Sequence, residues 1–457
     1  MRRAARRQLF VTCRRSGKNL LWSIALDERA LSCADRNMQG TGSRRMSDEC
    51  ANGERAQGVG LVALLIFTSL LTMLNSASFP ALVPVLQREW GLSNTEAGII
   101  SGIFYGGYIC AVPFTVSMTD HVDAKRIYLF ALVLTGLAGI AFAVFAEGFW
   151  SALFARALAG AGMAGTYMPG LRLITDRTAP RQQPRWIALY TANYALGLSV
   201  SFVATIEISA HVGWQGAILF ASGAALLCVL LILPVRQHVH DVPSGMRSIL
   251  PDLRPVLKNR PALRYIGLYG LHNWELFAFQ SWIVAYLTWC GIEARLGAAW
   301  AGWVSWLTAL FLVAGTAASI GTAELAARFG RPRVVRIVMS LAVAGALVAG
   351  GGAHWPIAVT VIACLVFSML TMADSAAITT GAMFSAAEGQ RGATLAVHSI
   401  VGFTGGLLGP VVVGGVLDFS AAILGQASWL AGFFTMALGS VAGLFLLGRG
   451  RRIFEPH

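Results

Sequence analysis

Twelve long apolar stretches joined by short polar connections constrain this chain more than any other feature. Each runs for roughly 18 to 30 residues with few or no charges, and at about 1.5 Å per residue a helix of that length crosses a hydrocarbon core about 30 Å thick. We therefore predict an all-α membrane protein with twelve transmembrane helices. The predicted spans are residues 60–87, 95–118, 127–145, 149–175, 186–209, 214–235, 263–289, 297–326, 334–351, 355–384, 392–419 and 428–448.

Basic residues occupy alternate connections along the chain. Twenty Lys and Arg lie in the even-numbered connections, at the helix ends beside them and in the C-terminal tail, whereas the opposite connections carry only Arg88 and Arg295. Short loops rich in Lys and Arg stay in the cytoplasm. The pattern therefore places both termini and the long middle connection in the cytoplasm, which agrees with an even number of helices. The twenty are Lys125, Arg126, Arg172, Arg177, Arg181, Arg185, Arg236, Arg247, Arg254, Lys258, Arg260, Arg264, Arg328, Arg331, Arg333, Arg336, Arg391, Arg449, Arg451 and Arg452.

The composition agrees with a membrane protein and argues against a nucleic-acid partner. Hydrophobic residues make up 56% of the chain and charged residues 12%, against about 25% charged in soluble domains. The formal net charge of +13 comes from the N-terminal tail and the predicted cytoplasmic loops, so no nucleic acid is needed to explain it. The seven cysteines have neither disulfide nor metal spacing, and most fit as small apolar residues.

The chain divides into two helical bundles with polar segments around them. We predict a cytoplasmic tail without regular structure at residues 1–57, bundles at 58–235 and 263–448, a cytoplasmic linker at 236–262 and a cytoplasmic tail at 449–457. The linker is rich in proline and charge. Because residues 1–45 lack organised periodicity, we favour a translation start at Met46, and the alternative is a basic arm on anionic lipid. We expect residues 1–45 to be dispensable for insertion and transport.

The two bundles resemble each other at an offset of about 206 residues. The connection TDHVDAKR at 119–126 corresponds to AARFGRPR at 326–333, and Arg185 corresponds to Arg391. Two pseudo-symmetric halves joined by short loops suit a transporter in which one half rocks against the other.

Three motifs resemble those of the major facilitator superfamily of secondary transporters. The first is a degenerate loop motif, VSMTDHVDAKR, in which Asp120, Lys125 and Arg126 are retained. A second copy of this motif, ARFGRPR, has Ala327 in place of Asp and retains Arg328, Gly330, Arg331 and Arg333. The second runs from Arg156 through Gly160 to Gly162 in the fourth stretch, and the third is Gly409-Pro410 followed by Gly414-Gly415. The resemblance covers residues 58 to 450 and implies the fold of that superfamily, with two six-helix bundles around a central cavity lined by helices one, four, seven and ten.

Ionisable side chains deep in membrane helices are costly, so each is a functional candidate. Arg156, His272, Glu275, Asp374 and His398 meet this description. In the stretch HNWELFAFQSW, His272, Glu275 and Phe279 share one helix face, which should look away from lipid. Glu207 lies near a helix end and fits an interfacial carboxylate.

The resemblance adds cavity and gating residues to these candidates. The predicted substrate and proton pathway comprises Asn75, Tyr105, Tyr108, Arg156, Tyr167, His272, Trp274, Glu275, Gln280, Asp374 and His398. The predicted gating residues are Asp120, Lys125, Arg126, Arg328, Gly330 and Arg331. Asp120 in particular should dock on a helix N-terminus and hold the state that is closed to the cytoplasm.

No catalytic, cofactor or metal motif is present in the sequence, and without an ATP-binding loop the energy must come from a gradient. We expect a monomeric, multi-pass transporter in a bacterial cytoplasmic (inner) membrane. It would take up a small organic anion together with a proton, with Arg156 as a candidate counter-charge. Two alternatives stay open: an efflux antiporter for amphipathic compounds, and a membrane sensor or scaffold that transports nothing.

Overall fold

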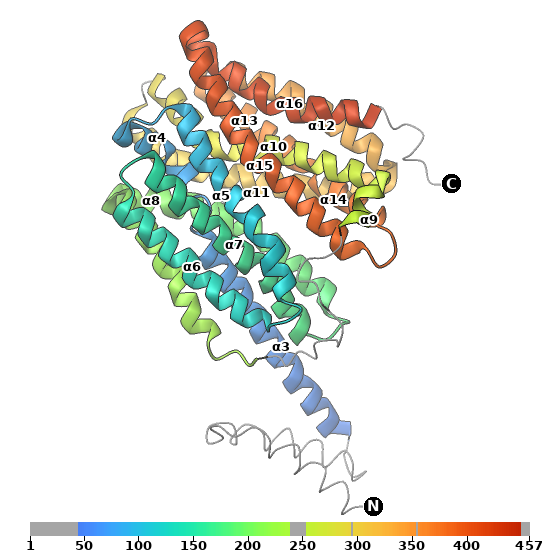
Figure 1. The fold of residues 1–457 in the computed structure, drawn as a ribbon. Coiled ribbons are helices and arrows are strands. Elements are labelled where there is room, and N and C mark those ends of the chain that lie inside the picture. The colour runs from blue at the N-terminus through green and yellow to red at the C-terminus, as the bar shows by residue number, and fades with distance from the viewer. Residues whose placement is uncertain (1–43, 238–252, 294–295, 353–354, 449–457) are drawn as a thin grey trace, which may run out of the picture. The chain divides into compact units, whose positions relative to one another are not determined.

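The computed structural model describes residues 44–237, 253–293, 296–352 and 355–448, and within these ranges the chain is helical with no strand. Contacts divide the chain into two units, residues 1–61 and 62–457, and the packing discussed below belongs to the second unit. Figure 1 shows the helices in chain order. They are α3 (Arg44–Met73), α4 (Ser78–Trp90), α5 (Asn94–Met118), α6 (Ala124–Phe145), α7 (Phe149–Arg177), α8 (Gln183–Ile232), α9 (Arg254–Lys258), α10 (Arg260–Glu293), α11 (Gly297–Phe329), α12 (Arg331–Gly351), α13 (Ile357–Ala373), α14 (Ser375–Phe384), α15 (Arg391–Leu424) and α16 (Ser428–Gly448), with a 3₁₀ turn at Gly425–Ala427.

The predicted tail and linker fall partly outside the described residues. Residues 1–43, 238–252 and 449–457 are not described, so the predictions there remain predictions. Residues 44–57 form the start of α3, which continues into the first apolar stretch. Within the predicted linker, Arg254–Lys258 form the short helix α9.

Eight segments in the described part of the chain are long and apolar enough to cross a membrane. Two of them each contain two of the predicted stretches, because α8 is interrupted at Gly213 and a short turn separates α15 from α16. The eight segments therefore cover ten of the twelve predicted stretches. The other two are α7 and α10, whose apolar character is lowered by Arg156 in α7 and by His272 and Glu275 in α10.

Two predicted helices are broken near their middle. The first consists of the second half of α3 and of α4, with residues 74–77 between them. The tenth consists of α13 and α14, with Asp374 at the break. Such breaks free backbone carbonyl and amide groups inside the bundle, and those groups need polar partners there.

Local sequence explains several helix ends. Ser93 and Glu96 form a capping box at the start of α5, and the Asp123 side chain caps α6. Gly330 ends α11 and precedes α12 with φ of 88°, a conformation that disfavours side chains, so this turn requires glycine.

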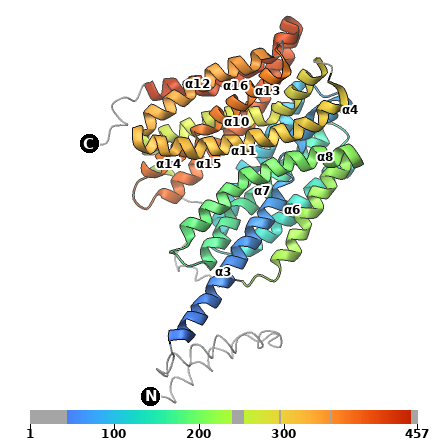
Figure 2. The ribbon, with the colours of Figure 1, turned by 180° about the vertical axis from the view of Figure 1, so that it is seen from behind.

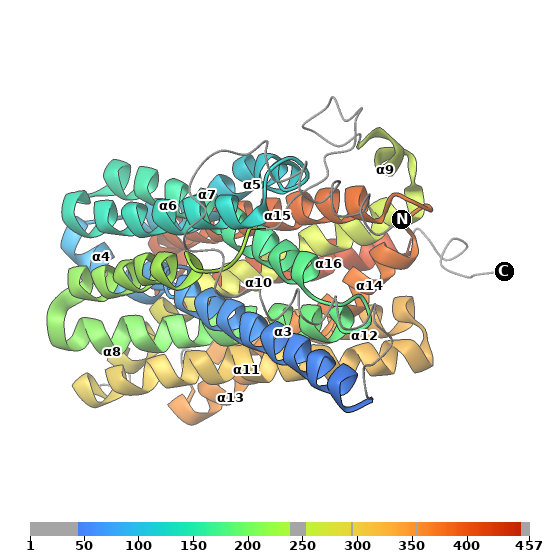
Figure 3. The same cartoon turned by 90° about the horizontal axis from the view of Figure 1, so that it is seen from below.

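The helix contacts repeat between the two halves. In the first half α5 packs on α7 and α6 on α8, and in the second half α11 packs on α13 and α12 on α16. Figure 2 shows α6, α7 and α8 together in one group and α10, α12 and α16 in the other. The halves meet through α5 with α15, α8 with α11, and α4 with α10. Figure 3 shows the first two of these pairs side by side. The contacts are those of two related halves.

Large apolar side chains cover the outside of the helices as well as the core. Phe130, Phe145, Trp150, Phe154 and Phe445 are each more than two thirds exposed. On a water-soluble protein such side chains would be unfavourable, whereas in a bilayer they face lipid. The chain is therefore built as a multi-pass membrane protein, as its sequence predicts.

Candidate functional site

The buried polar residues of the second half gather around α10. His272 Nδ1 lies 2.8 Å from Asp374 Oδ1, and both side chains are almost completely buried. Asp374 occupies the break between α13 and α14, and His272 lies near the middle of α10. Two ionisable side chains held in contact inside a membrane bundle are costly, and membrane proteins retain them mainly where they have a function.

Glu275 lies one helical turn after His272 and is 2% exposed. One of its carboxylate oxygens accepts a hydrogen bond from the Ser440 hydroxyl of α16. The other, Oε1, has no hydrogen-bond partner among the described residues. A buried carboxyl with a free oxygen can bind a proton or a polar ligand group.

His398 of α15 belongs to the same region. Its ring stacks on Tyr269 of α10 at 3.8 Å between centroids, and its Nε2 lies 3.3 Å from the Thr379 hydroxyl of α14. The Tyr269 ring also stacks on His272, at 5.9 Å. We call His272, Glu275, Asp374 and His398 the α10 cluster. The sequence had singled out all four by their burial in apolar helices, and the structure brings them together inside the second half.

An aromatic contact joins the two halves beside this cluster. Tyr105 of α5 lies 4.2 Å from Phe277 of α10, and Tyr108 lies 4.1 Å from Phe403 of α15, between ring centroids. The sequence predicted Tyr105 and Tyr108 but not their partners Phe277 and Phe403, since a phenylalanine in an apolar helix carries no signal of its own. The face of α10 opposite to Phe277 points into the second half, where Phe279 packs on Phe367 and Phe433.

Arg156 and Asn75 meet at the break in the first helix. The Arg156 guanidinium donates to the carbonyl oxygens of Asn75 and Ser76 at 3.1 and 3.2 Å, and it lies over the Phe104 ring at 4.4 Å. The Asn75 amide donates to the Ala221 carbonyl at 3.0 Å. Arg156 therefore binds backbone that the break has left without helical partners, and the Asn75 side chain ties the break to α8.

The other predicted pathway residues lie at separate places. Tyr167 of α7 packs against Tyr190 and Tyr194. The Trp274 indole donates to the Thr435 carbonyl of α16 at 3.0 Å. Gln280 is buried, and its Oε1 has no partner among the described residues.

The predicted gating loop is a network of charges at the end of the helices where α5 passes into α6, here called the Asp120 end. Asp120 lies 3.6 Å from Arg172 of α7, and both side chains are about two-fifths exposed. The Lys125 ammonium donates to the Leu233 and Val235 carbonyls at the end of α8, and Arg126 donates to Gln237.

A further carboxylate, Asp123, is central to this network. Arg177 contacts both of its oxygens at 2.8 and 2.9 Å, and both side chains are nearly buried. Asp123 was not among the predicted gating residues, although a second aspartate in the loop VSMTDHVDAKR was a visible signal.

The equivalent turn of the second half is simpler. Arg328 pairs with Glu324 at 3.5 Å on an exposed helix face. Arg331 lies over the Phe384 ring at 4.8 Å. Gly330 supplies the turn between α11 and α12 described above.

The opposite end of the helices, where α4 passes into α5, holds two polar contacts between the halves; we call it the Asn94 end. Asp418 of α15 accepts from the backbone and side chain of Asn94 at 3.0 and 2.8 Å, and from those of Thr95 at 2.7 and 2.6 Å. Glu207 of α8 accepts from the Ser305 hydroxyl of α11 at 2.8 Å. The halves are therefore joined at this end. Sequence reasoning missed Asp418, although an aspartate in the last two turns of an apolar helix is a visible signal.

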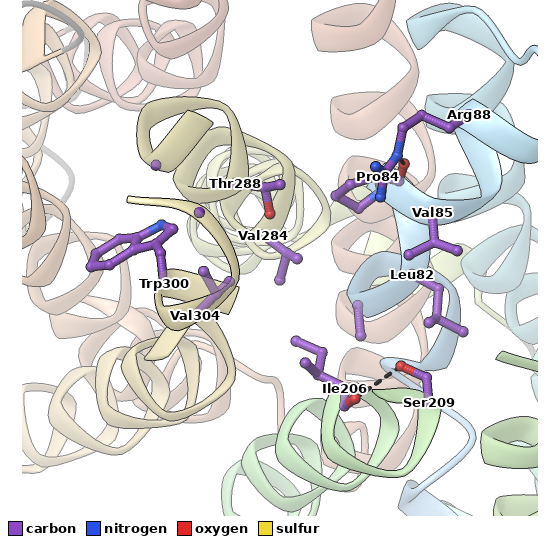
Figure 4. Close-up of a pocket in the computed structure, with 13 residues that line it drawn as sticks. Leu82, Pro84, Val85, Arg88, Ile206, Ser209, Val284, Thr288, Trp300 and Val304 are labelled. Atoms are coloured by element: carbon purple, nitrogen blue, oxygen red, sulfur yellow. Dashed lines mark hydrogen bonds between the residues drawn. The ribbon is translucent and has the colours of Figure 1, made fainter. Parts of the chain in front are cut away.

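A cavity of about 450 Å³ lies at the Asn94 end between α4, α8, α10 and α11 (Figure 4). We call it the α4–α11 pocket. Its walls are mainly apolar, and Arg88 contributes the charged side chain among the lining residues. It is separate from the α10 cluster, none of whose residues line it. Among the described residues, no group of three or more His, Cys, Asp or Glu side chains could hold a metal ion.

Two related helical halves, breaks within two of the long apolar helices and a buried polar cluster define a class of protein, the polytopic membrane proteins with the architecture of secondary transporters. The sequence profile of the Major Facilitator Superfamily matches residues 64–410, and the chain belongs to this superfamily.

Curated relatives are distant. A probable 4-methylmuconolactone transporter of Cupriavidus pinatubonensis is 25% identical over 58% of this chain and 61% of its own length, so the chain spans less than two thirds of that relative. The D-galactonate transporter of Escherichia coli is 22% identical over 86% of this chain and 96% of its own length.

Solved structures share the fold. A bacterial homologue of the human lysosomal transporter Spinster, in an inward-facing and unoccupied conformation, superposes with a TM-score of 0.68 at 13% identity. The match covers 86% of this chain and 95% of that one. The predicted superfamily and its fold are therefore confirmed.

Proposed function

We propose that this protein is a proton-coupled secondary transporter that takes up a small organic anion. The observation that carries the proposal is the α10 cluster: His272 and Asp374 in contact, with Glu275 close by, all buried in helices that cross a membrane. Such groups are retained in membrane helices at considerable cost, and proton relays are a frequent reason.

The cluster has a route by which its charge could act on the rest of the molecule. α10 carries His272 and Glu275 on one side and Phe277, which touches Tyr105 of the first half, on another. α15 carries His398 and also Asp418, whose contacts join the halves at the Asn94 end. A proton that changes the packing of α10 and α15 would therefore bias the contact between the halves, which is what coupling requires.

The choice of an organic anion as the substrate rests on the names of two relatives. The names of two relatives specify an organic lactone and a sugar acid, of which galactonate is an anion. Arg156 supports this choice less than the sequence suggested, because its guanidinium is engaged by the Asn75 and Ser76 carbonyls. We therefore place the substrate near the α10 cluster and the aromatic contact of Tyr105 and Tyr108 rather than at Arg156.

The proposal includes an orientation. The basic connections at the Asp120 end would face the cytoplasm of a bacterial cell, across the inner membrane. The Asn94 end, where Asp418 and Glu207 join the halves, would then face outward, and this conformation would be closed to the outside.

Uptake into proteoliposomes tests the function. Purified protein is reconstituted, a pH gradient of either sign is imposed, and a panel of radiolabelled sugar acids, aromatic carboxylates and neutral sugars is offered. We expect accumulation of at least one carboxylate only when protons flow into the vesicle with it. Accumulation driven by the opposite gradient would identify an antiporter instead, and uptake of none of the panel under either gradient would contradict the proposal.

A further inference from the structure

The α4–α11 pocket has the dimensions of a small-molecule site. Its volume of about 450 Å³ lies within the range of roughly 300 to 1,000 Å³ that is common for such sites. Residues of both halves line it, since α4 and α8 belong to the first and α10 and α11 to the second. Its depth is shown by Leu82, Val284 and Val304, which line the pocket and are themselves buried.

The walls of the pocket are suited to an apolar body. Figure 4 shows Leu82 and Val85 on one side of the space, Val284 and Val304 on the other, and Ile206 along its lower edge. Trp300 closes one flank, and its indole N–H is already bonded to the Leu287 carbonyl at 2.9 Å. It therefore offers the pocket aromatic surface rather than a free donor.

The mouth of the pocket carries a cation without a counter-charge. Arg88 is exposed, its Nε donates to the Pro84 carbonyl at 3.0 Å, and it forms no ion pair within the described ranges. The nearest acidic residue in sequence, Glu89, accepts from the Trp214 indole at 2.7 Å. Arg88 is also one of only two basic residues in the connections predicted for that side of the membrane, where basic residues are otherwise sparse.

We infer that the α4–α11 pocket binds a small amphipathic carboxylate, with the carboxylate at Arg88 and the apolar body between Val85, Ile206, Val284 and Val304. The planar guanidinium suits a carboxylate because it can donate two parallel hydrogen bonds. This site lies apart from the α10 cluster and does not depend on proton coupling, so the inference goes beyond the proposed function.

The volume favours a single small molecule over a membrane lipid. A cavity of about 450 Å³ matches the sites that bury a molecule of the size of an aromatic acid or a medium-length acyl acid. A phospholipid with two long chains is much larger. The occupant is therefore taken to be a free carboxylate.

Photolabelling can test this inference. The full-length protein in phosphatidylcholine nanodiscs is irradiated with 4-benzoylbenzoate, and the labelled residues are mapped by mass spectrometry; neutral 4-methylbenzophenone serves as the uncharged comparison. We expect saturable labelling by the acid of α4, α8, α10 and α11 around the pocket, and weak, unsaturable labelling by the neutral compound. Equal labelling by both compounds, or acid labelling confined to other helices, would overturn the inference.

Variants separate charge from shape. Arg88→Gln should weaken binding of the acid by about fivefold, the size expected for one partly exposed ion pair. Ile206→Trp and Val304→Trp should each abolish labelling, because the larger side chain fills the pocket. Ile206 is only half-buried, so Ile206→Trp should disturb folding less than Val304→Trp. Glu89→Gln changes the net charge beside the pocket but none of the residues that line it. This variant should therefore be labelled by the acid to the same extent as the native protein. An Arg88→Gln variant with native affinity would overturn the role of the cation.

Two controls separate this site from anionic lipid and from proton coupling. Adding phosphatidylglycerol to the nanodiscs should leave labelling unchanged, and loss of labelling would assign the pocket to anionic lipid and overturn the inference. Glu275→Gln should label normally even where it abolishes proton-driven transport. The site and the proposed function can thus fail independently.

Discussion

Arg156 satisfies the backbone where the first membrane helix is interrupted. Its guanidinium donates to the carbonyl groups of Asn75 and Ser76 and is almost completely buried. An unpaired carbonyl inside the bundle would cost about 1 to 3 kcal/mol. The family motif that drew attention to Arg156 does not reveal which atoms the side chain contacts.

Replacing Arg156 by Gln should therefore lower stability. Gln cannot reach both carbonyls with the same geometry, so we expect the free energy of unfolding to fall by about 2 kcal/mol. Thermal unfolding of the purified variant in detergent measures the loss. Arg333→Gln, on an exposed face of α12, is the matched control and should unfold as the native protein does. If the two variants were equally stable, the helix break would not need Arg156.

Glu275 differs from Arg156 because one of its oxygens has no partner among the described residues. Glu275→Gln keeps the shape and the contact with Ser440 but cannot bind and release a proton. We expect the variant to lose accumulation driven by a pH gradient while retaining exchange of substrate down its own gradient, both measured in proteoliposomes. Glu324→Gln, in an exposed ion pair, should behave as the native protein does. Unchanged accumulation would make Glu275 a structural hydrogen-bonding residue and Asp374 the next candidate.

Helices α5 and α15 form a close contact between the halves at two glycines of α5. A Cβ atom added at Gly98 would collide with the Pro410 carbonyl, and one added at Gly102 would collide with the Leu407 carbonyl. The two backbones therefore touch directly. The side chain of Asp418 adds hydrogen bonds to the first residues of α5, where the exposed amides and the helix dipole favour a carboxylate.

Asp418→Asn should loosen the Asn94 end. One of the two carboxylate oxygens becomes an amide that faces the N–H donors of α5, so an attraction turns into a repulsion. A loss of about 1.4 kcal/mol would shift the balance of conformations tenfold towards separation of the halves at this end. Spin labels at Gln215→Cys and Ala421→Cys, in a background without native cysteines, should report a longer distance. If the distance distribution between the spin labels were the same in the Asp418→Asn variant as with the native Asp418, the hydrogen bonds of Asp418 would not be what holds this end closed.

Asp120→Asn should act in the opposite sense. In this conformation Asp120 pairs only loosely with Arg172 of its own half, and we expect it to stabilise the other state, closed at the Asp120 end, by docking on a helix N-terminus. Because such a contact contributes up to about 2 kcal/mol, the effect on transport should be partial while expression stays normal. Transport rates indistinguishable from native would remove Asp120 from the mechanism.

The two halves of the molecule are related in their contacts as well as in their sequence. The pairing of α5 with α15 across the halves is matched by that of α8 with α11, which is the pattern that exchanging the halves would produce. The offset of about 206 residues also relates Pro169 within α7 to the break after Asp374. The fourth and tenth helices are thus weakened at equivalent positions.

Labelling of cysteines tests the orientation of the whole molecule. A membrane-impermeant maleimide added to intact cells should modify Gln215→Cys at the Asn94 end and should not modify Ser248→Cys in the predicted cytoplasmic linker. Permeabilised cells should allow both reactions, which controls for reactivity. Modification of Ser248→Cys from outside would reverse the proposed orientation.

The helical, membrane-spanning character of the chain and the order of its apolar stretches follow from the sequence alone. Length, hydropathy and charge are properties of each stretch by itself, so they can be read without knowing its neighbours. For the same reason the sequence singled out His272, Glu275, Asp374 and His398, because an ionisable group in an apolar helix is costly wherever it points.

The partners of these groups were decided only by the tertiary structure. Asp418 lies more than three hundred residues from Asn94, and Arg156 binds carbonyl groups that exist as free acceptors only because another helix is broken. Which face of α10 meets the first half, and which meets α16, depends on the rotation of that helix within its bundle. Such rotations are set by close packing among many helices, and no local pattern in one helix specifies them.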